Sequence, residues 1–312
     1  MNAAADPPGQ GRAPGGRPLR RRVREFLELL AIPLACALLP WSLGLRLLRL
    51  LARWRGWYRE EVELATLYAE RAGCAPDPAV FARRLRLRLL VEGVDPFVVA
   101  LRRRRRLVAR WVRAEGDPLP DSGPALFLGT HYGCGYWFVP YMAERGLPLN
   151  IVAPPMETVL RGANVLQRLF RRLRLALLAR AAGRPLLHRG GAFEAMLGIL
   201  ARGDVGFGLC DLPTARPDAT PVQLAGRATR LSPAMFRLAA RAGAPVYLFW
   251  SDIDLANGQR RVHLERLQAA TEAGQVDAFA RMLSARIAAD PSGWRFWSIG
   301  GEFFPELLRP QA

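Results

Sequence analysis

The stretch Ala125-Leu126-Phe127-Leu128-Gly129-Thr130-His131-Tyr132-Gly133-Cys134-Gly135-Tyr136-Trp137 decides the fold class of this chain. An apolar run ends at His131, and glycines follow before a helical pattern begins, which predicts a buried strand, a turn and a helix. A histidine at the carboxyl end of such a strand faces a cleft, and its imidazole can take a proton near neutral pH. His131 is therefore a candidate catalytic base; the alternative is a structural histidine that bonds a nearby carbonyl.

The same succession of strand and helix patterns continues through residues 117–312. Short apolar runs alternate with helical patterns, which indicates a layered α/β domain around a core sheet. The expected strands are Ala125–Gly129, Leu149–Ala153, Pro185–His188, Val205–Cys210 and Pro245–Trp250. The expected helices are Tyr136–Arg145, Glu157–Ala181, Ala192–Ala201 and Pro233–Ala242.

Three segments precede this domain. Residues 1–18, rich in Ala, Pro, Gly and Arg, are typical of a disordered tail, and residues 19–59 form a membrane-anchoring or interfacial segment. Residues 60–116 are predicted to be helical. The expected helices there are Glu61–Ala72, Asp77–Leu90 and Val98–Arg113, with breaks at Cys74–Pro76 and Asp95–Pro96.

The apolar run Phe26–Leu51 admits three interpretations. Ala35-Cys36-Ala37 has the spacing of a signal-peptide cleavage site, but the apolar run continues well past it. A transmembrane span is the second, although charges and prolines interrupt the run. Because arginines alternate with Leu and Trp from Leu43 to Arg59, a helix lying in the membrane interface is the third. The Arg20–Arg22 cluster ahead of the run favours a cytoplasmic N-terminus.

Charge and cysteine usage limit the function classes. All 45 basic residues are arginines, against 27 acidic ones, and the formal net charge is +18. This charge favours anionic membranes, nucleic acid or an acidic carrier protein, and the run Arg102–Arg106 points to a phospholipid surface or an acidic partner. No nucleic-acid-binding module is present, and nucleic acid is not an expected partner. Four widely spaced cysteines argue against a zinc site or a disulfide framework. A chain without Lys has no P-loop, and there is no Gly-x-Ser-x-Gly elbow.

From about Arg24 to Pro305 the chain resembles the late acyltransferases of lipid A biosynthesis, within the lysophospholipid acyltransferase-like group. Motifs in the family's order carry the resemblance, rather than any single block. They are Leu39-Pro40-Trp41, the His131 block, Leu149–Val152, Leu200–Val205 leading to Asp211, Leu224–Thr229, Ala239–Val246 and Asp290–Trp297.

The resemblance implies a mechanism without metal, cofactor or covalent intermediate. A histidine deprotonates a lipid hydroxyl or amine, which attacks the thioester of acyl carrier protein or acyl-CoA. In the family a carboxylate five residues later orients the imidazole, as in a Ser-His-Asp triad. Here that position is Tyr136, which can hydrogen-bond the ring nitrogen but is neutral at pH 7. Either Asp211 folds back to His131, or the enzyme works without an acid, or the protein is a catalytically lapsed lipid-binding or complex-forming relative.

The resemblance implies further site residues and a location. Asp211 would bind the acceptor or complete the site, the alternative being a helix cap or turn residue. Arg189 would meet phosphate on the lipid or the carrier, the alternative being a solvated surface residue. Gly226 and Thr229 would shape the wall of the site, whereas His188 and His263 have no motif and are expected to be structural. The expected location is the cytoplasmic face of the inner membrane.

Overall fold

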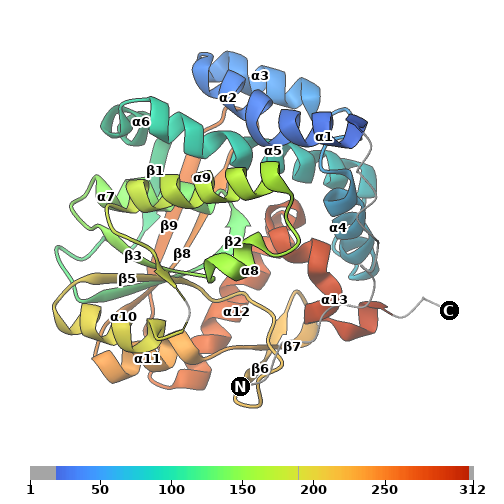
Figure 1. The fold of residues 1–312 in the computed structure, drawn as a ribbon. Coiled ribbons are helices and arrows are strands. Elements are labelled where there is room, and N and C mark those ends of the chain that lie inside the picture. Colours follow the sequence, from blue (N-terminus) through green and yellow to red (C-terminus); the bar gives the residue numbers. More distant parts are fainter. Residues whose placement is uncertain (1–18, 189, 309–312) are drawn as a thin grey trace.

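A seven-stranded sheet forms the centre of the computed structural model, which describes residues 19–188 and 190–308 (Figure 1). Its strand order is β1-β9-β8-β2-β5-β3-β4. The strands from β8 to β4 are parallel to one another, while β9 and β1 run in the opposite direction. The bounds are β1 Val112–Gly116, β2 Ala125–Gly133, β3 Leu149–Ala153, β4 Leu187–His188, β5 Val205–Leu209, β8 Val246–Ile253 and β9 Arg260–Arg266. β6 (Thr220–Leu224) and β7 (Arg227–Leu231) form a separate hairpin.

The predicted α/β class is confirmed, and each expected strand is present; Leu149–Ala153 has the predicted bounds, and the other four have shifted ends. The edge of the sheet differs from the prediction. Residues 112–116, placed in the helical segment, form β1 and pair with β9. β1 reads Val-Arg-Ala-Glu-Gly, and a strand this polar carries no apolar run to reveal it.

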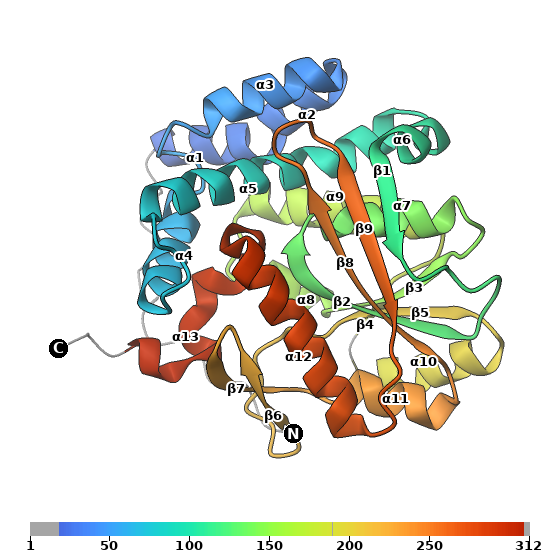
Figure 2. The same ribbon diagram turned by 180° about the vertical axis from the view of Figure 1, so that it is seen from behind.

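Helices cover both faces of the sheet (Figures 1 and 2). On one face α7 (Phe138–Ala143) and α9 (Val165–Ala182) lie over aromatic strand residues; Phe138 stacks on Phe249 with centroids 3.8 Å apart. The other face carries α10 (Ala192–Ala201), α11 (Ala234–Ala242) and α12 (Glu272–Ala289). Because strand side chains alternate, the sheet separates two apolar cores. Short elements complete this part: η2 Gly135–Trp137, α8 Met156–Leu160, η3 Pro291–Gly293, η4 Arg295–Ile299, α13 Gly300–Phe303 and η5 Pro305–Leu308.

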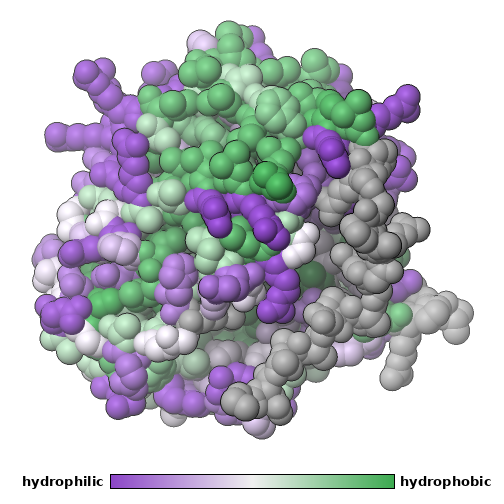
Figure 3. All heavy atoms as spheres, viewed as in Figure 1, coloured by the Kyte–Doolittle hydropathy of each residue, from purple (hydrophilic) through white to green (hydrophobic). Residues whose placement is uncertain are grey.

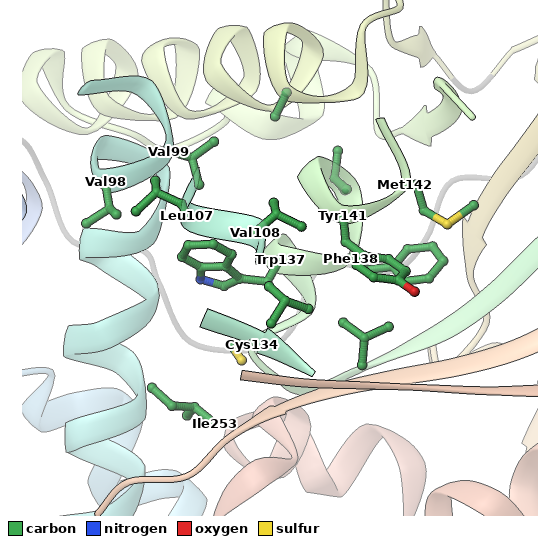
Figure 4. Packing of buried hydrophobic residues seen from close by; sticks show 14 of the residues in the cluster. Val98, Val99, Leu107, Val108, Cys134, Trp137, Phe138, Tyr141, Met142 and Ile253 are labelled. Atoms are coloured by element: carbon green, nitrogen blue, oxygen red, sulfur yellow. The ribbon is translucent and has the colours of Figure 1, made fainter. Parts of the chain in front are cut away.

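The N-terminal helices pack onto this domain and share its core. They are α1 Leu19–Phe26, η1 Leu27–Ala31, α2 Ile32–Leu38, α3 Trp41–Leu51, α4 Arg59–Arg71, α5 Pro78–Leu101 and α6 Arg104–Trp111. Side chains of α5, α6 and α7 meet around Trp137, including Val99, Leu107 and Val108 (Figure 4). Across residues 19–188 and 190–308, no helix combines the length and apolar character needed to cross a bilayer.

The expected break at Asp95–Pro96 is wrong, because α5 continues through it to Leu101. Pro96 removes one helical N–H, but both residues are buried and packing holds the helix on either side. Asp95 accepts a 2.5 Å bond from the guanidinium of Arg260, and neither side chain is exposed. That guanidinium also lies over the rings of three tryptophans. They are Trp41, Trp111 and Trp137.

Exposed apolar side chains gather on the outward side of α1, α2 and α3, beside exposed arginines such as Arg20, Arg22 and Arg46. Figure 3 shows a broad apolar surface over this part of the molecule, bordered by hydrophilic side chains. Several charged residues of these helices turn inward, among them Glu28 and Arg49. Glu28 is buried and accepts a bond from the backbone N–H of Tyr58 at 3.0 Å, and Arg49 donates to the carbonyl of Leu255. The exposed apolar side chains include Val23, Phe26, Leu34, Leu38, Leu43, Leu50 and Trp54.

Candidate functional site

The structure brings His131 and Asp211 together at the carboxyl edge of the parallel strands. β2 and β5 are neighbours, with Gly129 opposite Leu209, so the two candidate residues follow the same level of the sheet. Nδ1 of His131 lies 2.8 Å from Oδ1 of Asp211. The backbone N–H of His131 donates to Oδ2 of Asp211 at 2.7 Å. Ligands of open α/β sheets bind outside this edge, so the pair lies where a ligand of such a sheet would be expected.

Asp211 fixes the tautomer of the histidine. Its side chain is fully buried, and its two oxygens accept three bonds, the third coming from the indole N–H of Trp294 at 3.2 Å. An ionised Asp211 can only accept, so a neutral His131 ring bonded to it carries its hydrogen on Nδ1. In that tautomer Nε2 carries the lone pair. Within residues 19–188 and 190–308, no protein group bonds Nε2, so it is free to accept a proton from a substrate.

The C-terminal segment closes over the histidine ring. The ring of Phe296 lies 4.3 Å from that of His131, and Trp294 is completely buried beside it. The His131 side chain remains 28% exposed, which leaves room for a reacting group. The sequence does not predict a part for Trp294 and Phe296 in this site, although both lie in the motif Asp290–Trp297.

The local path of the chain explains the orientation of His131. Pairing between β2 and β8 shifts register between Gly129 and Gly133. Such an irregularity re-aims side chains and is common beside active sites. Gly133 has φ +66°, and a Cβ there would meet the Ser251 carbonyl oxygen at 2.0 Å, so only glycine fits. The turn places His131 at the rim of the sheet.

Tyr136 does not bond His131 in the structure. The turn η2 points its side chain towards α9, where the hydroxyl donates to the carbonyl of Leu177 at 3.3 Å. Burial raises the pKa of Tyr136 well above its usual range, so the hydroxyl is neutral. The sequence left three alternatives for the acid that is missing at position 136. The geometry matches the one in which Asp211 contacts His131.

The other candidate residues lie in separate surroundings. Gly226 and Ala225 both have positive φ and form the turn between β6 and β7, and the hydroxyl of Thr229 donates to the Phe303 carbonyl at 2.7 Å. Nδ1 of His188 lies 3.1 Å from the Pro154 carbonyl. Arg189 lies outside the described residues.

His263 stacks on Trp250 with centroids 3.8 Å apart, and burial lowers its pKa. Thus His188 and His263 each have a local structural partner.

Two thiols close to the site are poorly suited to nucleophilic chemistry. Cys134 and Cys210 are buried, and burial raises the pKa of each thiol far above its usual value. Across the described ranges 19–188 and 190–308, no group of three or more His, Cys, Asp or Glu side chains is arranged to hold a metal ion.

No protein-family model and no curated protein sequence matches this chain.

Proposed function

We propose that the protein is a membrane-associated acyltransferase of the late lipid A acyltransferase-like type, with His131 as the general base. Nε2 takes the proton from a lipid hydroxyl or amine as that atom attacks the carbonyl carbon of a thioester. The carbon–sulfur bond breaks, and the departing thiolate takes a proton from the imidazolium. Asp211 holds the ring and offsets the positive charge that forms on it. The observation that carries the proposal is the Asp211–His131 pair with an open Nε2.

Direct transfer fits the site better than a covalent enzyme intermediate. Such an intermediate needs a protein nucleophile bonded to the base. In the described part of the chain no Ser, Thr or Cys side chain bonds His131, and the nearby thiols are buried. A nucleophile supplied by the acceptor itself, as in direct acyl transfer, is compatible with this geometry.

The donor and acceptor classes rest on the resemblance of the ordered motifs. These favour acyl carrier protein or acyl-CoA as donor and a lipid as acceptor. The strongly basic chain suits both an acidic carrier and a phosphorylated acceptor.

Membrane association is supported by the N-terminal helices. Many of the outward side chains of α1 to α3 are apolar, exposed arginines lie beside them, and Glu28 and Arg49 bond inside the protein. Helices with such a face, flanked by arginines, lie in the interface of a bilayer. We place the protein on the cytoplasmic face of the inner membrane.

The test uses labelled acyl carrier protein, vesicles containing a mixed lipid extract, and the full chain. Wild type and the control His263→Ala should move label into a lipid, whereas His131→Ala should lose at least about 100-fold in rate, the usual contribution of a general base. Equal rates for wild type and His131→Ala would contradict the mechanism. No transfer by folded wild type across several acceptors and donors would leave the catalytically lapsed alternative.

A further inference from the structure

An arginine-rich cavity of about 490 Å³ lies away from the His131 site. It is enclosed by the C-terminal ends of α5 and α9 and by the start of α6. Five arginines line it, namely Arg102, Arg103, Arg104, Arg105 and Arg180. Neither His131 nor Asp211 is part of its wall. We call it the arginine cavity.

Two of the five arginines hold the cavity together. Arg102 donates to the carbonyl of Ala37 at 2.8 Å and to that of Leu39, which ties the end of α5 to α2. Arg104 pairs with Glu144 at 2.5 Å and donates to the Ala181 carbonyl at 3.2 Å. These bonds hold the wall of the cavity in place. The carboxylate of Glu144, which lies in that wall, is already paired with Arg104.

The other three guanidinium groups are unpaired. Arg103, Arg105 and Arg180 are exposed, and within residues 19–188 and 190–308 none of them forms an ion pair or a side-chain hydrogen bond. Glu144 is already bound, and Tyr136 contributes a neutral hydroxyl. Repulsion among like charges in one cavity is relieved when an anion enters it.

Arg105 and Arg180 project from helices, and Arg103 lies in the two-residue link between α5 and α6. Leu107 and Val108 of α6 are buried against Trp137, so the helix that carries Arg105 is anchored in the core (Figure 4). Arginine guanidinium groups match the geometry of phosphate oxygens and can bind them through two parallel hydrogen bonds. The cavity is thus suited to a phosphate group.

The rim of the cavity adjoins exposed apolar side chains. Leu101, next to Arg102 in the chain, is 51% exposed, and Leu38, beside the carbonyl that Arg102 binds, is 68% exposed. These leucines extend the apolar surface of the N-terminal helices to the cavity. A ligand with a phosphate group and adjoining hydrocarbon chains would contact both the arginines of the cavity and these two leucines.

We propose that the arginine cavity binds the phosphate headgroup of an anionic phospholipid, with the lipid chains lying over Leu38 and Leu101. This rests on the membrane association in the proposed function and is independent of acyl transfer. It gives the protein a headgroup-selective contact separate from its reaction site. Glycerol phosphate carries the same phosphate without the chains and serves as the soluble comparison.

The test measures binding of the full chain to vesicles of phosphatidylcholine, with or without one fifth phosphatidylglycerol. Arg103→Gln/Arg105→Gln should weaken binding to the anionic vesicles about 25-fold, since each arginine near such a surface contributes about fivefold. Addition of Arg180→Gln should bring the loss to about 100-fold. The control Arg202→Gln/Arg266→Gln removes equal charge from exposed positions outside the cavity and should change binding less than threefold.

Each other result has a distinct meaning. Equal losses for the double variant and the control would show a general attraction and overturn the cavity proposal. Glycerol phosphate binding that the double variant abolishes, with vesicle binding unchanged, would assign the cavity to a soluble phosphate. Unchanged vesicle binding with lost transfer from acyl carrier protein would assign it to the carrier. If wild type binds no vesicle, membrane association itself fails.

Discussion

Asp211→Asn separates the charge of the acid from its shape. The carbonyl of the new amide can take the place of Oδ2 and keep the bonds from the His131 N–H and the Trp294 indole. Its nitrogen then replaces Oδ1, 2.8 Å from Nδ1, and donates to the ring. The ring must carry its hydrogen on Nε2 instead. The variant therefore presents no lone pair to the acceptor, although the fold is retained.

The expected loss in acyl-transfer rate is about 10⁴-fold, the effect of the same change in a Ser-His-Asp triad, or about 5.4 kcal/mol of transition-state stabilisation. Initial rates with labelled acyl carrier protein measure it, and the melting temperature should change little. Asp204→Asn, which removes an exposed carboxylate beside Arg184, is the matched control and should stay within twofold of wild type. If Asp211→Asn keeps at least one tenth of the wild-type rate while His131→Ala is inactive, the tautomer argument is refuted.

Two further predictions concern Tyr136 and Asp290. Tyr136→Phe should leave the transfer rate within about twofold of wild type, because its hydroxyl bonds Leu177 and not His131; a loss above 100-fold would give the hydroxyl a catalytic part. Burial alone would raise the pKa of Asp290, but bonds from Arg88 and other donors outweigh it, and the folded-state pKa lies below the usual value. Its stabilisation is present above about pH 4 and is lost as pH falls through the lowered pKa. The melting temperature of wild type should thus fall more steeply below about pH 4 than that of Asp290→Asn; parallel curves would contradict this.

The sequence predicted the two members of the His131–Asp211 pair but not their contact. His131 and Asp211 each follow an apolar run, so both could be proposed as residues at strand ends. Their contact depends on β2 and β5 being neighbours in register, although β3 and β4 lie between them in the chain. Nothing local encodes that adjacency, and it arises from packing of the whole sheet. Tyr136 is near His131 in sequence, but one tight turn directs it elsewhere.

Local rules failed where tertiary contacts override them. Pro96 predicts a helix end, yet burial against the core and the Asp95–Arg260 pair carry α5 onward. β1 and the hairpin of β6 and β7 are polar or short, so their pairing partners define them more than their composition does. Glu28 interrupts an apolar run, and only the structure shows that it faces inward.

The hydrogen bond from the Trp294 indole to Asp211 joins two residues that are made at different times during translation. During translation the apolar helices α2 and α3 leave the ribosome long before residue 294 does. The parts that would contact a bilayer are made first, and the donor that completes the reaction site is made among the last. Domains fold as their residues emerge, at about 5–20 residues per second. If the protein is the acyltransferase proposed above, a nascent chain would reach the membrane before its reaction site is complete, and the order of the sequence would then oppose premature acyl transfer.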